Sequence, residues 1–170
     1  MQLNQKKTKN MIFNFTNKYK FVTRLEANQE NIEVVDKTKL LGVVISSDFK
    51  WEENTNSLVK RAYGRMQLLR KVASFTSKRE DLLHIYKIFV RPILEQSSNV
   101  WSSSLTKDCI AALERVQKGA FKIILGDKYK NYEESLNQLH ETDLLTRRNM
   151  LSLKFAKKCT RNPKMKFFFL

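Results

Sequence analysis

The chain has 170 residues, 42% of them hydrophobic and 11% aromatic, and it carries a formal net charge of +15. This composition can bury a core, which excludes wholesale disorder, and the excess of positive charge favours polyanions as partners, nucleic acid before an anionic membrane. No apolar run approaches the roughly 20 residues of a membrane span, and the first residues lack the apolar segment of a signal peptide. Cys109 and Cys159 are far apart without CxxC spacing, so we expect no zinc site, no disulfide framework and an intracellular location, in the nucleus or cytoplasm.

The first fifty residues are predicted to form strands. Residues 11–15 are a β-rich run, and residues 19–25 alternate apolar or aromatic with polar side chains. Residues 32–35 and 40–45 flank a polar turn at 36–37, and two such runs predict a β-hairpin. Gly42 lies inside the last run, which indicates either a bulge or close backbone approach, or a glycine that the strand tolerates.

After residue 50 the apolar period changes from two to 3.6, which predicts a first helix over residues 51–75. Its apolar stripe consists of Leu58, Ala62, Met66, Leu69 and Ala73. Lys60 and Lys71 lie on the opposite side, and Arg61 and Arg65 flank the stripe.

The second predicted helix opens with a capping-box pattern, Ser77-Lys78-Arg79-Glu80. It is apolar nearly all round, which is typical of a central, buried helix. Pro92 removes an N–H group and clashes with the preceding turn, so we expect a kink near Val90 and Arg91.

The third helix is predicted to begin after a Thr106 cap and to end near Leu125 at Gly126. Its inner face consists of Ile110, Leu113, Val116, Ala120, Ile123 and Ile124, and its outer face of Arg115, Lys118 and Lys122. A short fourth helix follows over residues 132–139.

The fifth predicted helix has Thr142 as its cap and reaches Arg161 before Pro163. Its inner stripe consists of Leu144, Arg148, Leu151 and Phe155, and its outer face of Arg147, Lys154 and Lys158. The predicted fold is therefore α+β and mostly α: an N-terminal β-hairpin or meander over residues 1–50, then a bundle of about five helices over 51–165. Residues 166–170 form a divergent tail.

The sequence offers little support for catalysis. Two-metal nucleotidyl transfer needs clustered carboxylates, and the chain has no Asp-Asp pair; its Glu doublets fall at predicted helix starts, where they complement the helix dipole. We expect His84 to be a core or boundary residue and His140 to be exposed. Phosphate-binding glycine motifs are absent from the sequence.

The three basic rows, on the first, third and fifth predicted helices, are candidate phosphate contacts, with a solvated helix face as the alternative for each row. Three rows together with the net charge favour a shared groove. Trp51 is the more open candidate for stacking on bases, whereas Tyr86 and Trp101 are expected to pack in the core.

An ordered set of motifs resembles one family. The set consists of Leu3-Asn4-Gln5-Lys6-Lys7-Thr8-Lys9 with Met11-Ile12-Phe13, Lys39-Leu40-Leu41-Gly42-Val43-Val44-Ile45 with Asp48-Phe49-Lys50-Trp51, Ile85-Tyr86 with Val90-Arg91-Pro92-Ile93-Leu94-Glu95, Val100-Trp101, Leu113-Glu114-Arg115-Val116-Gln117, Tyr132-Glu133-Glu134-Ser135-Leu136 and Arg147-Arg148. Together they resemble the palm edge and thumb of non-LTR, LINE-type retrotransposon reverse transcriptases of the jockey and CR1 kind.

The resemblance implies roles for several residues. Lys7 or Lys9 would lie in the strand that follows the catalytic aspartates, and Leu41, Gly42 and Val43 would form the primer-grip hairpin. The helices after Trp51 would form the thumb, which closes on the template–primer duplex. The full-length family would use Mg²⁺, but the catalytic aspartates are absent here, so we expect no cofactor and no polymerase activity from this chain alone.

The function expected from the sequence is that of a reverse transcriptase fragment that still binds an RNA–DNA hybrid or duplex without sequence preference. The missing palm and fingers, or another protein at the exposed sheet edge, are further expected partners, and no membrane is expected. The alternatives are a helical protein–protein interaction module and a decayed remnant without function.

Overall fold

A computed structural model describes residues 4, 7–15, 25–27, 30–75 and 78–166. The chain divides into two compact units, Met1–Asn54 and Thr55–Leu170. The first contains short strands and the second contains helices, so the predicted class, α+β and mostly α, is confirmed.

The N-terminal unit contains two antiparallel strand pairs. Its strands are β1 (Glu26–Ala27), β2 (Glu30–Asn31), β3 (Lys37–Leu40) and β4 (Val43–Ser46), and β1 pairs with β2 and β3 with β4. The strand predicted at residues 11–15 is wrong, because that segment is irregular and only Asn10 next to it bridges Val34. Of the strand predicted at 19–25, all but Leu25 lies outside the described residues.

The β3–β4 hairpin turns at Leu41 and Gly42, not at the predicted residues 36–37. Both turn residues have positive φ, 50° at Leu41 and 88° at Gly42, as a two-residue primed turn requires. Lys37 pairs with Ser46 and Leu40 with Val43, so residue 37 begins a strand. Gly42 is therefore neither a bulge nor an interior strand residue: its freedom at positive φ allows the tight turn.

The helical unit contains the five predicted helices and several short additions. Its elements are α1 (Glu52–Ala73), α2 (Arg79–Ile85), the π-helical turn η2 (Tyr86–Val90), α3 (Arg91–Glu95), α4 (Ser98–Trp101), η3 (Ser102–Ser104), α5 (Lys107–Leu125), η4 (Gly126–Lys128), α6 (Tyr132–Gln138), α7 (Leu144–Arg161) and α8 (Pro163–Lys166). The sequence did not predict α4 or α8. None of the described helices is both long and apolar enough to cross a bilayer.

Near Pro92, where a kink was predicted, the structure has a π-helical turn. The chain runs continuously from α2 through η2 into α3, and the five residues before the proline-containing helix form a π turn instead of α-helix. Proline cannot donate a backbone hydrogen bond, and its ring needs room in the preceding turn. The wider π turn tolerates both. The N-cap of α2 falls on Lys78, one residue after the predicted Ser77, which lies outside the described residues.

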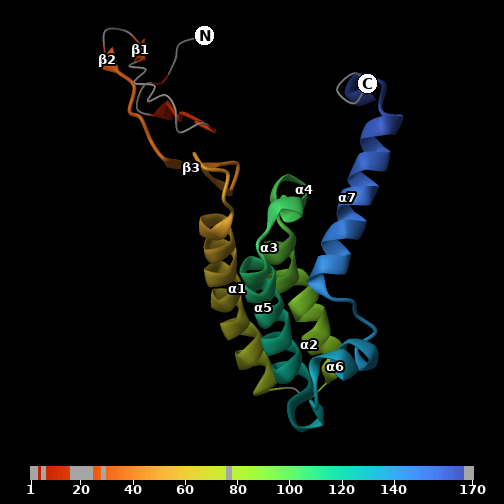
Figure 1. Cartoon of the computed structure of the whole chain (residues 1–170). Coiled ribbons are helices and arrows are strands. Elements are labelled where there is room, and N and C mark those ends of the chain that lie inside the picture. Colours follow the sequence, from red (N-terminus) through yellow and green to blue (C-terminus); the bar gives the residue numbers. More distant parts are fainter. Residues whose placement is uncertain (1–3, 5–6, 16–24, 28–29, 76–77, 167–170) are drawn as a thin grey trace. The chain divides into compact units, whose positions relative to one another are not determined.

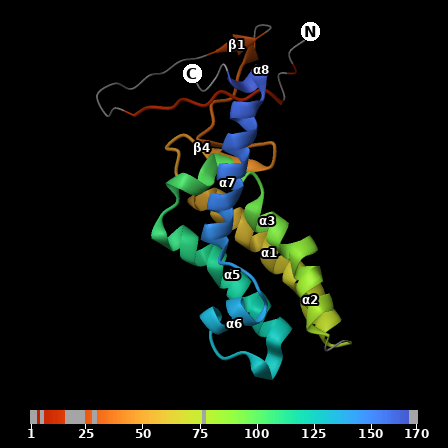
Figure 2. The same ribbon diagram turned by 90° about the vertical axis from the view of Figure 1, so that its right-hand side faces the viewer.

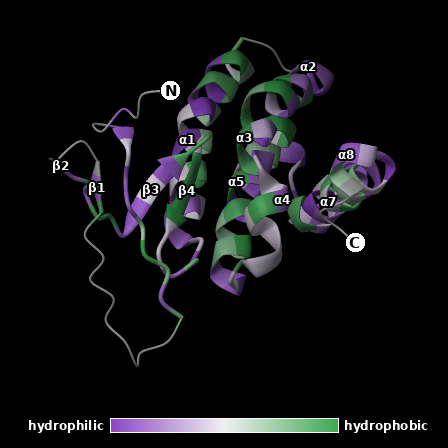
Figure 3. Ribbon diagram, turned by 90° about the horizontal axis from the view of Figure 1, so that it is seen from above, coloured by the Kyte–Doolittle hydropathy of each residue, from purple (hydrophilic) through white to green (hydrophobic). Residues whose placement is uncertain are grey.

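Helix α5 lies at the centre of the helical unit, between α1 and α7 (Figures 1 and 3). Thr106 caps it by accepting a hydrogen bond from the Cys109 amide, and Gly126 ends it with φ of 53°, both as predicted. Gly119 faces α1, where the Met66 methyl group lies within van der Waals reach of it. Phe121 meets the Tyr86 ring edge-on at 5.6 Å, which joins α5 to η2.

The predicted inner stripes of the first and third helices are confirmed in most positions. The buried members are Leu58, Ala62, Met66, Leu69, Leu113, Val116, Ala120 and Ile124. The colouring of Figure 3 shows the corresponding green faces of α1, α3 and α5 turned toward one another. Burial of these stripes stabilises the helices more than their intrinsic propensity does.

Two predictions about helix environment are wrong. The second predicted helix is not buried all round, because Ile88 and Phe89 are exposed and only one side packs against α5. His84 was predicted to be a core or boundary residue, but it lies on that solvent side and is exposed; His140 is exposed as predicted.

The cap of α7 is Asp143 and not the predicted Thr142. Its carboxylate accepts hydrogen bonds from the Thr146 amide and hydroxyl, at 2.8 and 2.7 Å.

Candidate nucleic-acid interface

The outer face of α5 presents the best-formed group of cations. Arg115, Lys118 and Lys122 are all exposed and lie on one side of the helix, opposite its buried stripe. The Lys118 ammonium lies 4.9 Å from the ring centre of Tyr132, and the Lys122 ammonium 5.4 Å from that of Tyr129. Cation–π attraction restricts both lysines without neutralising them. We call these five residues the α5 basic face.

The sequence did not predict that Tyr129 and Tyr132 belong to a basic surface. Tyr129 follows η4 and Tyr132 is the first residue of α6, and Figure 2 shows α6 beside the end of α5. The chain reverses direction after α5, and this places Tyr129 beside Lys122, seven residues earlier, and Tyr132 beside Lys118, fourteen residues earlier. The one sequence signal for this arrangement is that both tyrosines come shortly after Gly126, the glycine that ends α5.

A buried polar network holds this face in position. Gln117, on the inner side of α5, accepts a hydrogen bond from the Tyr86 hydroxyl at 2.5 Å and donates to the Tyr132 hydroxyl at 2.8 Å and to the Thr142 carbonyl at 2.9 Å. Tyr132 in turn donates to the Glu114 carboxylate. Burial, together with this bond to Glu114, raises the pKa of Tyr132, so its hydroxyl remains a donor at neutral pH.

The row predicted on α1 is divided. Lys60 and Lys71 are exposed, three turns apart on one side of the helix. Arg61 is half-buried, and its guanidinium donates to the Gln96 side chain at 2.6 Å, which ties α1 to the residue after α3. Arg61 and the exposed Arg65 line a cavity of about 400 Å³ beside Ile93, so Arg61 does not share a solvated face with the lysines.

The row predicted on α7 is also divided, and the prediction of an outer face for Arg147 is wrong. Arg147 forms a two-pronged ion pair with Glu95 of α3, with nitrogen–oxygen distances of 2.5 and 3.3 Å. This hydrogen bonding raises the pKa of Arg147. Glu95 also faces Arg91, which pairs with Glu141 at 2.9 Å. Arg147 is therefore part of an internal ionic network and is not available as a free phosphate contact.

Lys154 and Lys158 are exposed, as predicted, on the second half of α7. This half extends past the ends of the neighbouring helices (Figure 1), and Leu153 and Phe155 are exposed there too. Phe155 was predicted to belong to the inner stripe, and that prediction is wrong because its side chain is 44% exposed, although it lines a small cavity with Met165 of α8. From Leu144 to the end of the sequence the chain contains no Asp or Glu, so this segment is purely basic.

Arg148 is fully buried, as its place in the inner stripe predicted. Its Nε donates to the Ser102 hydroxyl at 3.1 Å, and its guanidinium lies 5.8 Å from the ring centre of Trp101. Its two terminal nitrogens have no hydrogen-bond acceptor within the described part of the chain. Burial lowers the pKa of Arg148.

The candidate residues of the N-terminal unit have varied environments. Lys7 is exposed, whereas Lys9 forms an ion pair with Glu33. Leu41 is 90% exposed at the hairpin tip beside Gly42, but Val43 is buried and presents no surface to a ligand.

Trp51 is only 7% exposed, so the prediction that it is open for base stacking is wrong. Trp101 and Tyr86 are buried, as predicted. Both cysteines, Cys109 and Cys159, are buried and unbridged. The described residues contain no group of three or more His, Cys, Asp or Glu side chains able to hold a metal ion.

The chain was compared with protein-family models, curated proteins and solved structures. No family model, no curated protein and no solved structure matches the chain.

Proposed function

We propose that the helical unit binds double-stranded nucleic acid, an RNA–DNA hybrid or a duplex, through phosphate contacts made by the α5 basic face. The observation that carries the proposal is the arrangement of Arg115, Lys118 and Lys122 on one exposed side of α5, with two of the cations held over tyrosine rings. Restricted cations lose less conformational entropy when they bind a phosphate. The exposed lysines Lys60, Lys71, Lys154 and Lys158 supply additional long-range attraction.

We further propose that the chain derives from a LINE-type reverse transcriptase and that this unit corresponds to its thumb. The motif resemblance supports the proposal, as does the sharp β3–β4 hairpin with Leu41 and Gly42 at its tip, followed directly by helices. No polymerisation step is assigned to these residues, because the sequence contains no Asp-Asp pair.

The test is fluorescence anisotropy of a labelled RNA–DNA hybrid over a series from 50 to 200 mM salt. Each phosphate contact contributes about 0.9 to the slope of log affinity against log salt. The combined variant R115Q/K118Q/K122Q should therefore reduce the slope by up to about 2.7. Random-sequence and fixed-sequence hybrids should bind equally, because phosphate contacts do not read bases.

The matched control is K39Q/K107Q/K130Q, which removes the same charge from exposed positions outside the α5 basic face. It should change the slope much less. Equal slopes for the two triple variants would show that only net charge matters and would overturn the assignment to α5. Absence of binding at 50 mM salt would reject nucleic-acid binding and favour the second candidate function.

That second candidate is a protein–protein interaction module. It is favoured by the exposed apolar side chains Leu153 and Phe155 on the projecting half of α7 and Met150 just before it. A concentration-dependent molar mass in light scattering, abolished by L153D, would support it.

A further inference from the structure

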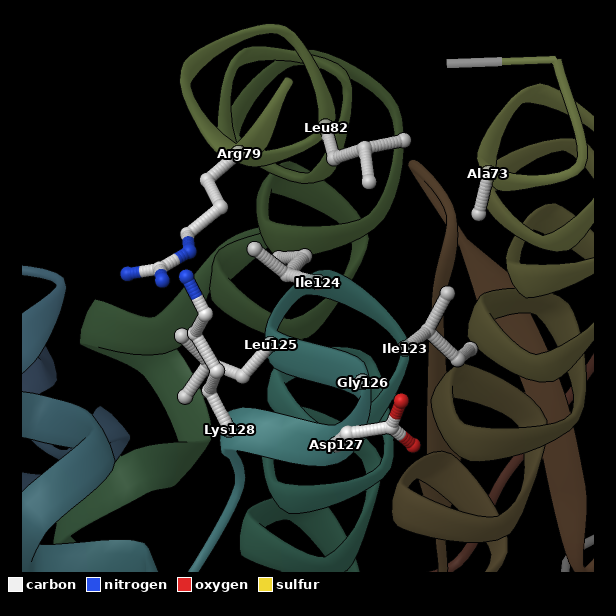
Figure 4. Close-up of a pocket in the computed structure, with 9 residues that line it drawn as sticks. All are labelled: Ala73, Arg79, Leu82, Ile123, Ile124, Leu125, Gly126, Asp127 and Lys128. Atoms are coloured by element: carbon white, nitrogen blue, oxygen red, sulfur yellow. The ribbon is translucent and has the colours of Figure 1, made fainter. Parts of the chain in front are cut away.

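One cavity of the helical unit lies outside the proposed duplex interface. It has a volume of about 410 Å³ and is formed where α1 ends, α2 begins and α5 gives way to η4. Ala73, Leu82, Ile123 and Ile124 provide apolar side chains along it (Figure 4). The volume falls in the range of small-molecule sites. Polar and apolar groups contribute about equally to its exposed lining.

Two cations face one end of this cavity. The guanidinium of Arg79 and the ammonium of Lys128 point to the same end, although they come from segments 49 residues apart in the sequence (Figure 4). Neither of them pairs with a carboxylate in the part of the chain that the structure describes. Arg147, by contrast, is neutralised within the helical unit by Glu95. Two converging positive charges repel each other, and an anion between them removes that cost.

The opposite side of the cavity has a different polarity. Asp127 points away from the two cations and lies on the side of Ile123 (Figure 4). A carboxylate there is an acceptor for an N–H donor of a ligand. The cavity thus has three zones: a positively charged end, an aliphatic middle, and a hydrogen-bond acceptor at the far side.

We propose that this cavity binds an organic phosphate whose body is a flat ring bearing an amino group, that is, a nucleoside monophosphate. The phosphate lies between Arg79 and Lys128, the base lies against Leu82, Ile123 and Ile124, and its exocyclic amine donates to Asp127. The ligand is either a free nucleotide or the 5′-phosphorylated end of a strand, because both carry the same chemistry.

The experiment is isothermal titration of the full chain with adenosine 5′-monophosphate, and with inorganic phosphate and adenosine as its separate halves. Adenosine monophosphate should bind more tightly than either half. R79Q and K128Q should each weaken binding about tenfold, the effect of losing one charge-assisted hydrogen bond. The matched control K107Q removes a lysine from the other end of α5 and should leave binding unchanged.

Two further variants separate the parts of the site. I123W fills the aliphatic middle while retaining both cations, and it should abolish binding with an unchanged circular dichroism spectrum. D127N should weaken the binding of adenosine monophosphate by less than R79Q does, and it should leave the binding of inorganic phosphate unchanged. Titration with 5′-phosphorylated and unphosphorylated tetranucleotides distinguishes the two sources of the ligand, since a strand-end site prefers the phosphorylated oligomer over the free nucleotide.

The proposal is overturned if no titrant binds, if inorganic phosphate binds as tightly as adenosine monophosphate, or if R79Q and K128Q bind like the unaltered chain. Its outcome is separate from that of the proposed function. Arg79 and Lys128 do not belong to the α5 basic face, so R115Q/K118Q/K122Q should retain nucleotide binding and R79Q should retain the salt slope for duplex.

Discussion

Replacing Gln117 by leucine tests whether the buried polar network holds the α5 basic face in place. The substitution keeps nearly the same shape at a fully buried position and removes three hydrogen bonds. The Tyr86 hydroxyl and the Thr142 carbonyl then lose their partners, whereas Tyr132 still donates to Glu114. A buried group left unsatisfied costs about 1–3 kcal/mol. The Tyr86 hydroxyl is fully buried and the Thr142 bond only partly, so the two together cost about 3 kcal/mol.

Leucine returns about 1 kcal/mol through its greater apolar burial, so Q117L should lower the free energy of unfolding by about 2 kcal/mol. The measurement is urea denaturation followed by circular dichroism, with linear extrapolation to zero denaturant. Q67L makes the same change at an exposed glutamine of α1 and should stay within about 0.5 kcal/mol of the unaltered chain.

A double-mutant cycle sharpens the test. Y86F removes the hydroxyl that Q117L leaves without a partner, so the double variant Q117L/Y86F should be about 1.5 kcal/mol more stable than the sum of the single changes predicts. Two results would refute the reasoning: a Q117L chain as stable as the unaltered one, or strict additivity in the cycle. Either would mean that Gln117 does not couple α5 to η2.

Two more predictions concern α7. Hydrogen bonds from Thr146 outweigh the effect of burial and lower the pKa of Asp143 below its ordinary 3.8. This group therefore stabilises the fold above that ordinary value and loses its contribution as pH falls through the lowered pKa. D143A should cost about 1 kcal/mol at pH 7, and its deficit relative to the unaltered chain should shrink when thermal unfolding is repeated between pH 4 and 2. Arg148 is buried with two unsatisfied nitrogens, so R148M should raise the free energy of unfolding by about 1 kcal/mol in urea, whereas a loss above about 2 kcal/mol would show that the guanidinium is satisfied in solution.

Local sequence signals predicted several elements correctly because the interactions that end a helix are themselves local. Thr106 and Gly126 delimit α5 as expected, since a side-chain oxygen at the start and a positive φ at the end act within one turn. The π turn before Pro92 follows from a missing N–H group and needs no distant partner. The hairpin turn was misplaced because an apolar residue, Leu41, occupies a positive-φ position that polar turn residues usually fill.

Local signals did not predict which candidate site residues are exposed. Helical spacing grouped Arg147 with Lys154 and Lys158, and spacing does place them on one side of α7. Glu95, 52 residues earlier in the chain, removes Arg147 from that surface. Trp51 stands among polar neighbours in the sequence, yet it is buried. Period and composition do not indicate which distant element covers a side chain.

The sequence by itself determined the mostly helical class, the ends of α5, the apolar stripes of α1 and α5, and the excess of positive charge. Each of these follows from the period of side chains along one element or from contacts within a turn. Tertiary structure alone decided which cations remain free, which tyrosines lie beside Lys118 and Lys122, and that Arg79 and Lys128 face the same cavity. Those properties depend on segments far apart in the chain, and only packing of the helices brings such segments together.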